Sequence, residues 1–369
     1  MVYNKKVLFL LIVLFSNILL GQTISLTEIS FNYESGNAND AITIKDYLTN
    51  SNITAPEYIA NTKNDEFAYI MGQGKPKIKV KIDGLESNKN YLITACVVSG
   101  NGFSNISKFI VPACGMGTNI YFFELDNEVP NAVGKYDFVW EWKIITYPVN
   151  SPYCTSTYTK TTEHTCYVIY DTPKEPELTP RNEILNYACE WASGKNIEDD
   201  ICNDILNNGF KNNYIYGGGW DCSNLSSDFV RLVSSIGLNA YLHKWASKSD
   251  SVNYHMFRMT TKLRTPLNTL YPSFYPDNLT WGYHQWAEAG GYQFDPSLDS
   301  DNSIQGDWGD YEDYLFAGYT YIYNENAMYQ PNYSGQSEGC EAPNNRTYTG
   351  YPNTSSILQE WFGPNYSNN

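Results

Sequence analysis

The stretch Tyr214–Gly237 reads YIYGGGWDCSNLSSDFVRLVSSIG and holds a cysteine shortly after three consecutive glycines. From that cysteine on, apolar side chains recur at helical spacing, at Cys222, Leu225, Phe229, Leu232, Val233 and Ile236. This spacing predicts a helix with one buried face that begins at Cys222 and stops at Gly237. The dipole and unpaired N–H groups of a helix N-terminus favour the thiolate, which is the nucleophilic form of cysteine. The glycines lack a Cβ, so they leave room for a substrate backbone beside the sulfur.

A nucleophilic cysteine needs a base, and the base needs a partner that orients it. Among the four histidines, His284 opens the stretch HQWAEAGGYQFDP, which predicts two short strands joined at Gly290-Gly291. A two-residue loop places Asp295 diagonally from His284 on the same face, and a four-residue loop places Asp295 directly opposite. Either loop predicts a histidine–aspartate pair. His255 is the rival base, but the next ionisable residues after it are basic.

A cysteine at a buried helix start after a glycine-rich loop, then H-x-W-x-E and F-D-P-S, resembles the transglutaminase-like superfamily of papain-related enzymes. The resemblance covers roughly residues 183–298. It implies that Cys222 is the nucleophile, His284 the general base and Asp295 its orienting partner. It also implies an oxyanion hole made by the backbone N–H of the cysteine and by one upstream side chain, either Trp191 or Tyr216.

Trp220, Trp286 and Glu288 are interpreted as structural walls of the cleft and not as chemical groups. The expected reaction is acyl transfer on an amide of a protein, a peptide or the cell wall, by hydrolysis or transamidation and without a cofactor. YGGGWDCSNLSSDF also resembles the cysteine helix of bacterial peptidoglycan endopeptidases, in which a histidine on the next strands is the base, and this favours His255. A catalytically silent binding or surface-assembly protein is the alternative of another class.

The N-terminus predicts export. Lys5 and Lys6 precede the apolar run Val7–Leu20, which is followed by Gly21, as in a cleaved signal peptide of residues 1–21. The run is too short for a stable membrane span, although an uncleaved anchor is the alternative. A secreted or extracytoplasmic location follows. With a net charge of −16 and no basic cluster, the chain is not expected to bind nucleic acid or an anionic membrane surface.

The domain organisation follows from a change of periodicity along the chain. Residues 22–172 alternate apolar and polar side chains, as in KPKIKVKI (Lys75–Ile82), which predicts an all-β, Ig-like antiparallel sandwich. Residues 173–180 are proline-rich and predict a stiff linker. Residues 181–328 show helices first and strands later, which predicts an α+β papain/transglutaminase-like domain. Residues 329–369 form a tail rich in tyrosine, asparagine and proline.

The eight cysteines, in an exported chain, predict disulfides. The local pairs 96/114, 154/166 and 189/202 close the shortest loops, while Cys222 and Cys340 either pair with each other or stay free. No CxxC or HxxxH occurs, so no metal site is expected. The segment DSDN (Asp299–Asn302) lacks the glycine and final glutamate of a calcium loop and is interpreted as a solvated acidic turn.

Overall fold

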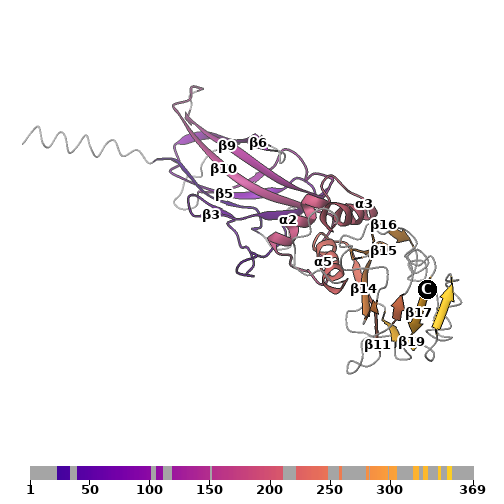
Figure 1. Cartoon of the computed structure of the whole chain (residues 1–369). Helices are drawn as coiled ribbons and strands as arrows, with labels where there is room; N and C mark the ends of the chain where they lie inside the picture. Colours follow the sequence, from indigo (N-terminus) through magenta and orange to yellow (C-terminus); the bar gives the residue numbers. More distant parts are fainter. Residues whose placement is uncertain are drawn as a thin grey trace, which may run out of the picture. The chain divides into compact units, whose positions relative to one another are not determined.

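The computed structural model is mostly β-sheet with few helices (Figure 1). It describes residues 23–33, 40–100, 105–110, 119–149, 152–210, 222–247, 257–259, 280–281, 283–297, 299–305, 319–323, 327–330, 340–341 and 347–350. Within these ranges, no helix is both long enough and apolar enough to span a bilayer. The predicted signal peptide lies outside the described residues.

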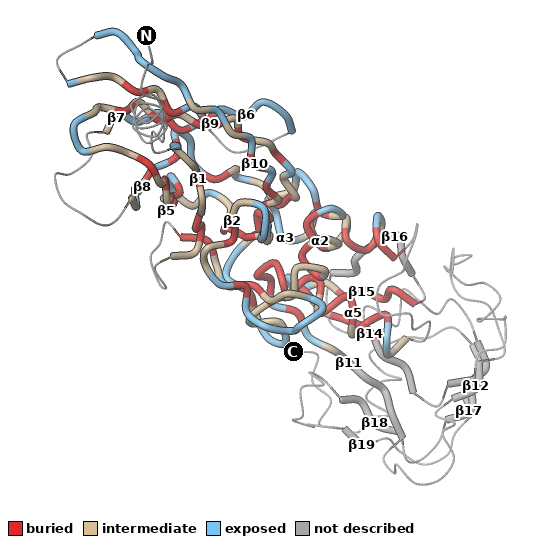
Figure 2. The backbone as a smooth tube through the Cα atoms, turned by 90° about the vertical axis from the view of Figure 1, so that its left-hand side faces the viewer, coloured by how far each residue is buried: buried red, intermediate tan, exposed pale blue. Residues whose placement is uncertain are grey.

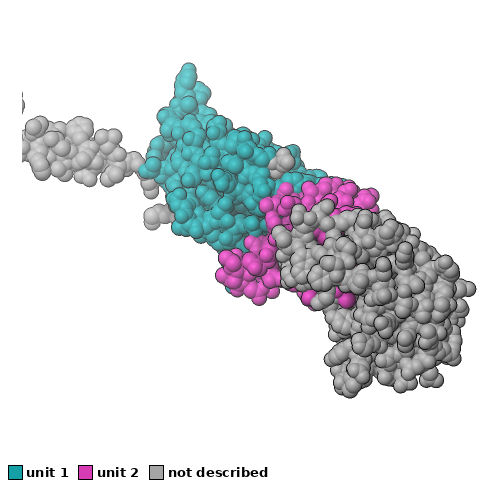
Figure 3. Space-filling view, viewed as in Figure 1, with its two compact units in different colours: residues 1–44, 51–131, 136–167 teal, residues 45–50, 132–135, 168–369 magenta. Residues whose placement is uncertain are grey.

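The chain forms two compact units, which Figure 3 shows in different colours. Unit 1 comprises residues 1–44, 51–131 and 136–167, and unit 2 comprises residues 45–50, 132–135 and 168–369. Two short segments, residues 45–50 and 132–135, therefore belong to unit 2, although each interrupts a stretch of unit 1 in the sequence. Backbone hydrogen bonds hold them there: Lys45 N–H to Pro180 O (2.9 Å), Asn182 N–H to Lys45 O (2.9 Å), Val133 N–H to Lys195 O (2.7 Å) and Gly194 N–H to Val133 O (2.8 Å).

Unit 1 contains two five-stranded sheets. The first has the order β3-β2-β1-β5-β8, made of β1 (Ser25–Ser30), β2 (Tyr58–Ile59), β3 (Lys63–Asn64), β5 (Lys77–Asp83) and β8 (Ile120–Glu124). The second has the order β4-β10-β9-β6-β7, made of β4 (Phe67–Ile70), β6 (Lys89–Gly100), β7 (Ile106–Ile110), β9 (Gly134–Pro148) and β10 (Ser156–Ile169). In β5 every second residue is fully buried, as the alternation of its lysines predicts.

The two sheets of unit 1 share one aromatic core. Phe123 of β8 lies 6.4 Å from Trp142 of β9, measured between ring centroids, and Phe31 after β1 lies 6.1 Å from Trp140 of β9. The core also holds His164 of β10, which is only 3% exposed. Its ring centroid lies 5.2 Å from that of Trp140 and 5.3 Å from that of Phe31. Burial lowers the pKa of His164 to about 3, so this side chain is neutral in the folded protein.

Thr162 connects this histidine to the core. Its Oγ1 lies 2.8 Å from Nε2 of His164 and accepts the indole N–H of Trp142 at 2.9 Å. Among the residues that the structure describes, Nδ1 of His164 is buried without a hydrogen-bond partner. A positive charge on this ring would therefore be both desolvated and poorly bonded.

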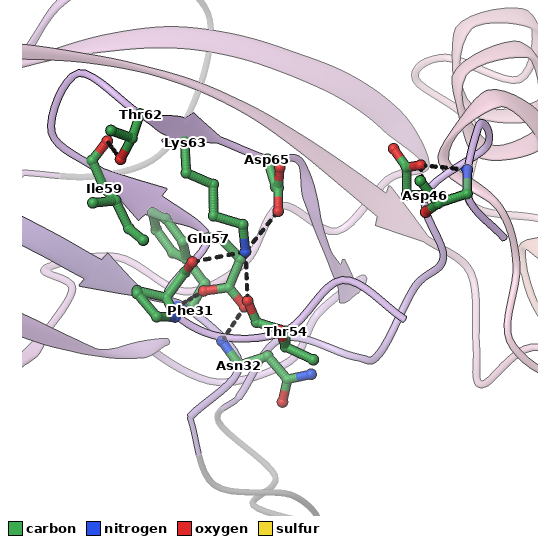
Figure 4. Close-up of polar contacts among 11 residues, drawn as sticks. Phe31, Asn32, Asp46, Thr54, Glu57, Ile59, Thr62, Lys63 and Asp65 are labelled. Carbon is green, nitrogen blue, oxygen red and sulfur yellow. Dashed lines mark hydrogen bonds and ion pairs between the residues drawn. The ribbon is translucent and has the colours of Figure 1, made fainter. Parts of the chain in front are cut away.

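A buried carboxylate fixes the end of β1 (Figure 4). The carboxylate of Glu57 accepts the backbone N–H of Phe31 at 2.7 Å and that of Asn32 at 3.2 Å. Nearby, Nζ of Lys63 donates to the carbonyl of Thr54 at 2.7 Å and forms an ion pair with Asp65 at 2.7 Å. Burial raises the pKa of Glu57. These bonds join the end of β1 to the turn before β2.

Unit 2 combines helices with two further sheets. Its helices are α2 (Asn182–Trp191), α3 (Glu198–Asp204), the π-helix η1 (Ile205–Phe210) and α5 (Cys222–Ser235). A six-stranded sheet has the order β16-β15-β14-β11-β18-β19, made of β11 (Ala240–Ser247), β14 (Tyr283–Ala289), β15 (Tyr292–Asp295), β16 (Asp299–Gln305), β18 (Ala327–Gln330) and β19 (Cys340–Glu341). A four-stranded sheet has the order β13-β12-β17-β20, made of β12 (Phe257–Met259), β13 (Thr280–Trp281), β17 (Tyr319–Tyr323) and β20 (Thr347–Gly350).

Two segments that the sequence assigns to a linker and a tail are bonded to elements of unit 2. The segment 173–180, expected to be a linker, is bonded to α5: the N–H of Lys174 donates to the carbonyl of Ser234 at 2.9 Å, and Arg231 pairs with Glu177 at 2.7 Å. Strands β19 and β20 lie within the expected tail of residues 329–369 and pair with β18 and β17. The acidic segment DSDN is a strand, since Asp299–Asn302 opens β16, and not a turn.

The predicted disulfides 96/114, 154/166 and 189/202 are wrong, because Cys96, Cys154, Cys166, Cys189, Cys202 and Cys222 are all free thiols. Strand β10 runs from residue 156 through Cys166, which separates that cysteine from Cys154 by about 30 Å. The thiol of Cys189 instead donates to the carbonyl of Val168 at 3.6 Å. Burial raises the pKa of Cys189 and of Cys202, so both act as small apolar core residues.

Candidate active site

Cys222 is the first residue of α5, as the sequence predicts. Its thiol is free and half-buried, while Leu225, Phe229 and Leu232 further along the helix are fully buried. Figure 2 colours the buried residues red, including much of α5. The helix ends at Ser235, and Gly237, two residues later, has a φ of +99°. A side chain at this glycine would also collide with Asp171, since its Cβ would lie 2.2 Å from the carbonyl oxygen of that residue.

The strands β14 and β15 form the predicted hairpin. Ala289 pairs with Tyr292, so the turn contains only Gly290 and Gly291. Both glycines have positive φ values, 59° and 81°, which is typical of a two-residue turn that matches the twist of the strands. The structure thus has the shorter of the two loops that the sequence allows. In this register, Glu288 pairs with Gln293, and continuing it brings residue 284 opposite residue 297.

Helix α5 packs on this hairpin. Phe229 of α5 stacks on Phe294 of β15, with ring centroids 5.0 Å apart and an interplanar angle of 29°. The helix contacts β14, β11 and β15. Cys222, His284 and Asp295 therefore come from three elements that pack against one another. His284 lies in β14, where its backbone pairs with Trp245 of β11, but its side chain lies outside the described part of the structure.

Asp295 is buried and strongly hydrogen-bonded. Only 2% of the residue is exposed. One carboxylate oxygen, Oδ1, accepts the backbone N–H of Ser297 at 2.9 Å and its hydroxyl at 2.6 Å. Donors that bind a carboxylate favour its charged form, and they offset the cost of burying it. Asp295, the orienting partner that the resemblance implies, is thus fixed by hydrogen bonds from the turn that follows it.

Trp286 of β14 is hydrogen-bonded to β15. It is fully buried, and its indole N–H donates to Oε1 of Gln293 at 2.7 Å. The amide of Gln293 in turn donates to Oε2 of Glu288 at 3.3 Å. This polar chain joins β14 to β15 across one face of the hairpin. Sequence reasoning missed Gln293, because its partners become visible only when the register of the hairpin is known.

Of the other residues singled out from the sequence, the structure describes Trp191 but not Tyr216, Trp220 or His255. Trp191 ends α2 and contacts Phe210 of η1, with ring centroids 6.2 Å apart. Phe210 in turn contacts Phe229 at 6.0 Å, so an aromatic series connects α2 to the cysteine helix. Tyr216, Trp220 and the rival base His255 lie outside the described residues. In the part of the chain that the structure describes, no three His, Cys, Asp or Glu residues are arranged to hold a metal ion.

Gly209 fits α2 against η1, and replacing it should destabilise unit 2. A Cβ at this position would lie 2.3 Å from Cε3 of the Trp191 ring. We expect Gly209→Ala to lower the free energy of unfolding by about 1–3 kcal/mol, as overpacking does. Urea denaturation measures the loss. In a Trp191→Ala background the same substitution should cost almost nothing, and an equal cost in both backgrounds would contradict this packing.

Comparisons with known proteins leave the family of the chain open. No protein-family model matches it, and no curated protein matches its sequence. Among solved structures, it is similar to the transglutaminase of red sea bream, with a TM-score of 0.30 and 8% sequence identity. That match covers 66% of this chain and 51% of the other, so the chain spans about half the length of that protein. A likeness at this level does not establish a shared activity.

Proposed function

We propose that the chain is an exported, transglutaminase-like cysteine enzyme that acts on amide bonds of a protein, peptide or cell-wall substrate. One observation carries the proposal: the helix that begins at Cys222 packs on the hairpin of His284 and Asp295. In this proposal unit 1 is an Ig-like sandwich, unit 2 is a papain/transglutaminase-like domain, and residues 1–21 are a cleaved signal peptide.

The first half of the reaction forms a thioester. The thiolate of Cys222 attacks the amide carbonyl carbon, and the backbone N–H of that cysteine helps to stabilise the oxyanion. Trp191 or Tyr216 is the candidate for the second oxyanion donor. His284, which has taken the thiol proton, returns a proton to the leaving nitrogen as the C–N bond breaks. Asp295 orients the imidazole and stabilises its positive charge. Ammonia or an amine leaves.

The second half of the reaction decides the product. Water or a second amine attacks the thioester carbonyl and loses its proton to His284. The C–S bond breaks, and the thiolate of Cys222 is regenerated. Attack by water gives hydrolysis, and attack by an amine gives transamidation. Both outcomes need the same three residues.

Amide turnover tests this function. The whole protein is incubated with a glutamine-rich protein, with and without a biotinylated primary amine, and separately with bacterial cell wall. We expect release of ammonia, of new amino termini or of soluble cell-wall peptides by the wild type and none by Cys222→Ala. Incorporation of the amine would identify transamidation. Equal results for the two proteins on every substrate would contradict the proposed function and favour a silent binding protein.

A further inference from the structure

Ser297 uses both of its donors on one buried oxygen. Its N–H and hydroxyl reach Oδ1 of Asp295 at 2.9 and 2.6 Å, and only 1% of Ser297 is exposed. The N–H bond closes a local turn over Pro296, and any residue at position 297 with a backbone N–H makes that bond. The hydroxyl bond is different, because only serine or threonine supplies an uncharged hydroxyl donor on Cβ.

The hydroxyl bond has consequences for the carboxylate. A donor at 2.6 Å from a carboxylate oxygen is a charge-assisted hydrogen bond of the short and strong kind. Two donors on the same oxygen restrict rotation of the carboxylate and stabilise its negative charge. Both effects matter for a group that orients a base, since it must stay ionised and in one rotamer while the imidazole becomes charged.

The rest of the hairpin is held by other bonds. Gly290 and Gly291 form the turn, and Gln293 joins Trp286 to Glu288. The Ser297 hydroxyl is therefore not needed to form the strands. It acts on Asp295 itself.

We propose that Ser297 is a positioning residue of the candidate site, whose hydroxyl keeps Asp295 ionised and in the orientation that the base requires. This inference rests on the proposed function. It predicts that the reactivity of Cys222 depends on a hydroxyl that does not touch the substrate.

The test is the rate at which iodoacetamide alkylates Cys222 in the whole protein, followed as a function of pH. Peptide mass spectrometry must identify the modified residue, because Cys96 and Cys154 are exposed free thiols as well. We expect Ser297→Ala to slow alkylation at neutral pH about tenfold, as for loss of a hydrogen bond to a charged group. Ser297→Thr should restore the rate, because threonine keeps the hydroxyl.

Ser235→Ala is the matched control. Ser235 is also fully buried, and its hydroxyl donates to the carbonyl of Leu232 at 2.7 Å near the C-terminal end of α5. This variant loses a comparable bond and should alkylate at the wild-type rate. A slowing equal to that of Ser297→Ala would mean that any loss of stability lowers the reactivity, and it would overturn the positioning role.

A double-mutant cycle with Asp295→Ala separates positioning from structure. If Ser297 acts through the carboxylate, Ser297→Ala has no further effect on the alkylation rate once Asp295 is gone. A further slowing in that background overturns the inference. If Asp295→Ala slows alkylation and Ser297→Ala does not, the positioning role fails while the proposed function stands. If neither Asp295→Ala nor His284→Ala slows it, the proposed function fails, and the inference with it.

Discussion

Lowering the pH from 7 to 4 is expected to reduce the free energy of unfolding by about 3 kcal/mol through His164 alone. The pKa of this side chain falls from 6.5 to about 3 on folding, because the ring is buried among aromatic side chains. Between these two values, the unfolded chain binds a proton that the folded chain does not. The stabilisation is complete above pH 6.5 and is lost at about 1.4 kcal/mol per pH unit as the pH falls towards 3.

The comparison with His164→Phe isolates this contribution. Phenylalanine keeps an aromatic ring beside Phe31 and Trp140 but does not titrate. Acidic side chains also titrate in this range. Glu57 acts in the opposite direction, because its folded pKa is raised and protonation stabilises the fold. The wild type and His164→Phe have the same acidic side chains, so these contribute equally to the pH dependence of both. Urea denaturation at pH 7 and pH 4 should show a smaller pH dependence for the variant, and equal dependence in both would contradict the role of His164.

The elements nearest the candidate site could be predicted from the sequence because the spacing of their apolar residues indicates which side chains are buried. Apolar side chains at helical spacing gave the start of α5 at Cys222. Gly237, two residues past the end of the helix, is required by its close approach to Asp171. The Gly-Gly pair predicted the hairpin of β14 and β15. The choice between its two loop lengths needed the structure, because both keep the same residues on one face.

Other features depend on contacts that leave no local pattern. The segments 45–50 and 132–135 belong to unit 2 because of backbone hydrogen bonds. Residues with almost any side chain can form such bonds, so the sequence carries no sign of them. The disulfide prediction failed because it rested on expected export, which would permit disulfides but does not bring two thiols together. Here Cys189 faces the carbonyl of Val168. The bonds of Ser297 to Asp295 and of Gln293 to Trp286 follow from the register and rotamers of one hairpin.

Replacing His284 should abolish the reactivity of Cys222. If this histidine takes the thiol proton, His284→Ala removes the base that generates the thiolate at neutral pH. Loss of a general base commonly lowers a rate by about a hundredfold or more. His255→Ala is the matched control, because His255 is the other histidine considered as the base and no acidic residue follows it at hairpin distance.

The most direct measurement is the alkylation rate of Cys222 by iodoacetamide near neutral pH in the wild type, His284→Ala and His255→Ala, read at that residue by peptide mass spectrometry. We predict rapid alkylation in the wild type and in His255→Ala, and almost none in His284→Ala. The reverse order would assign the base to His255 and favour a peptidoglycan-endopeptidase-like hydrolase. Equal rates in all three proteins would contradict a Cys222–His284 pair.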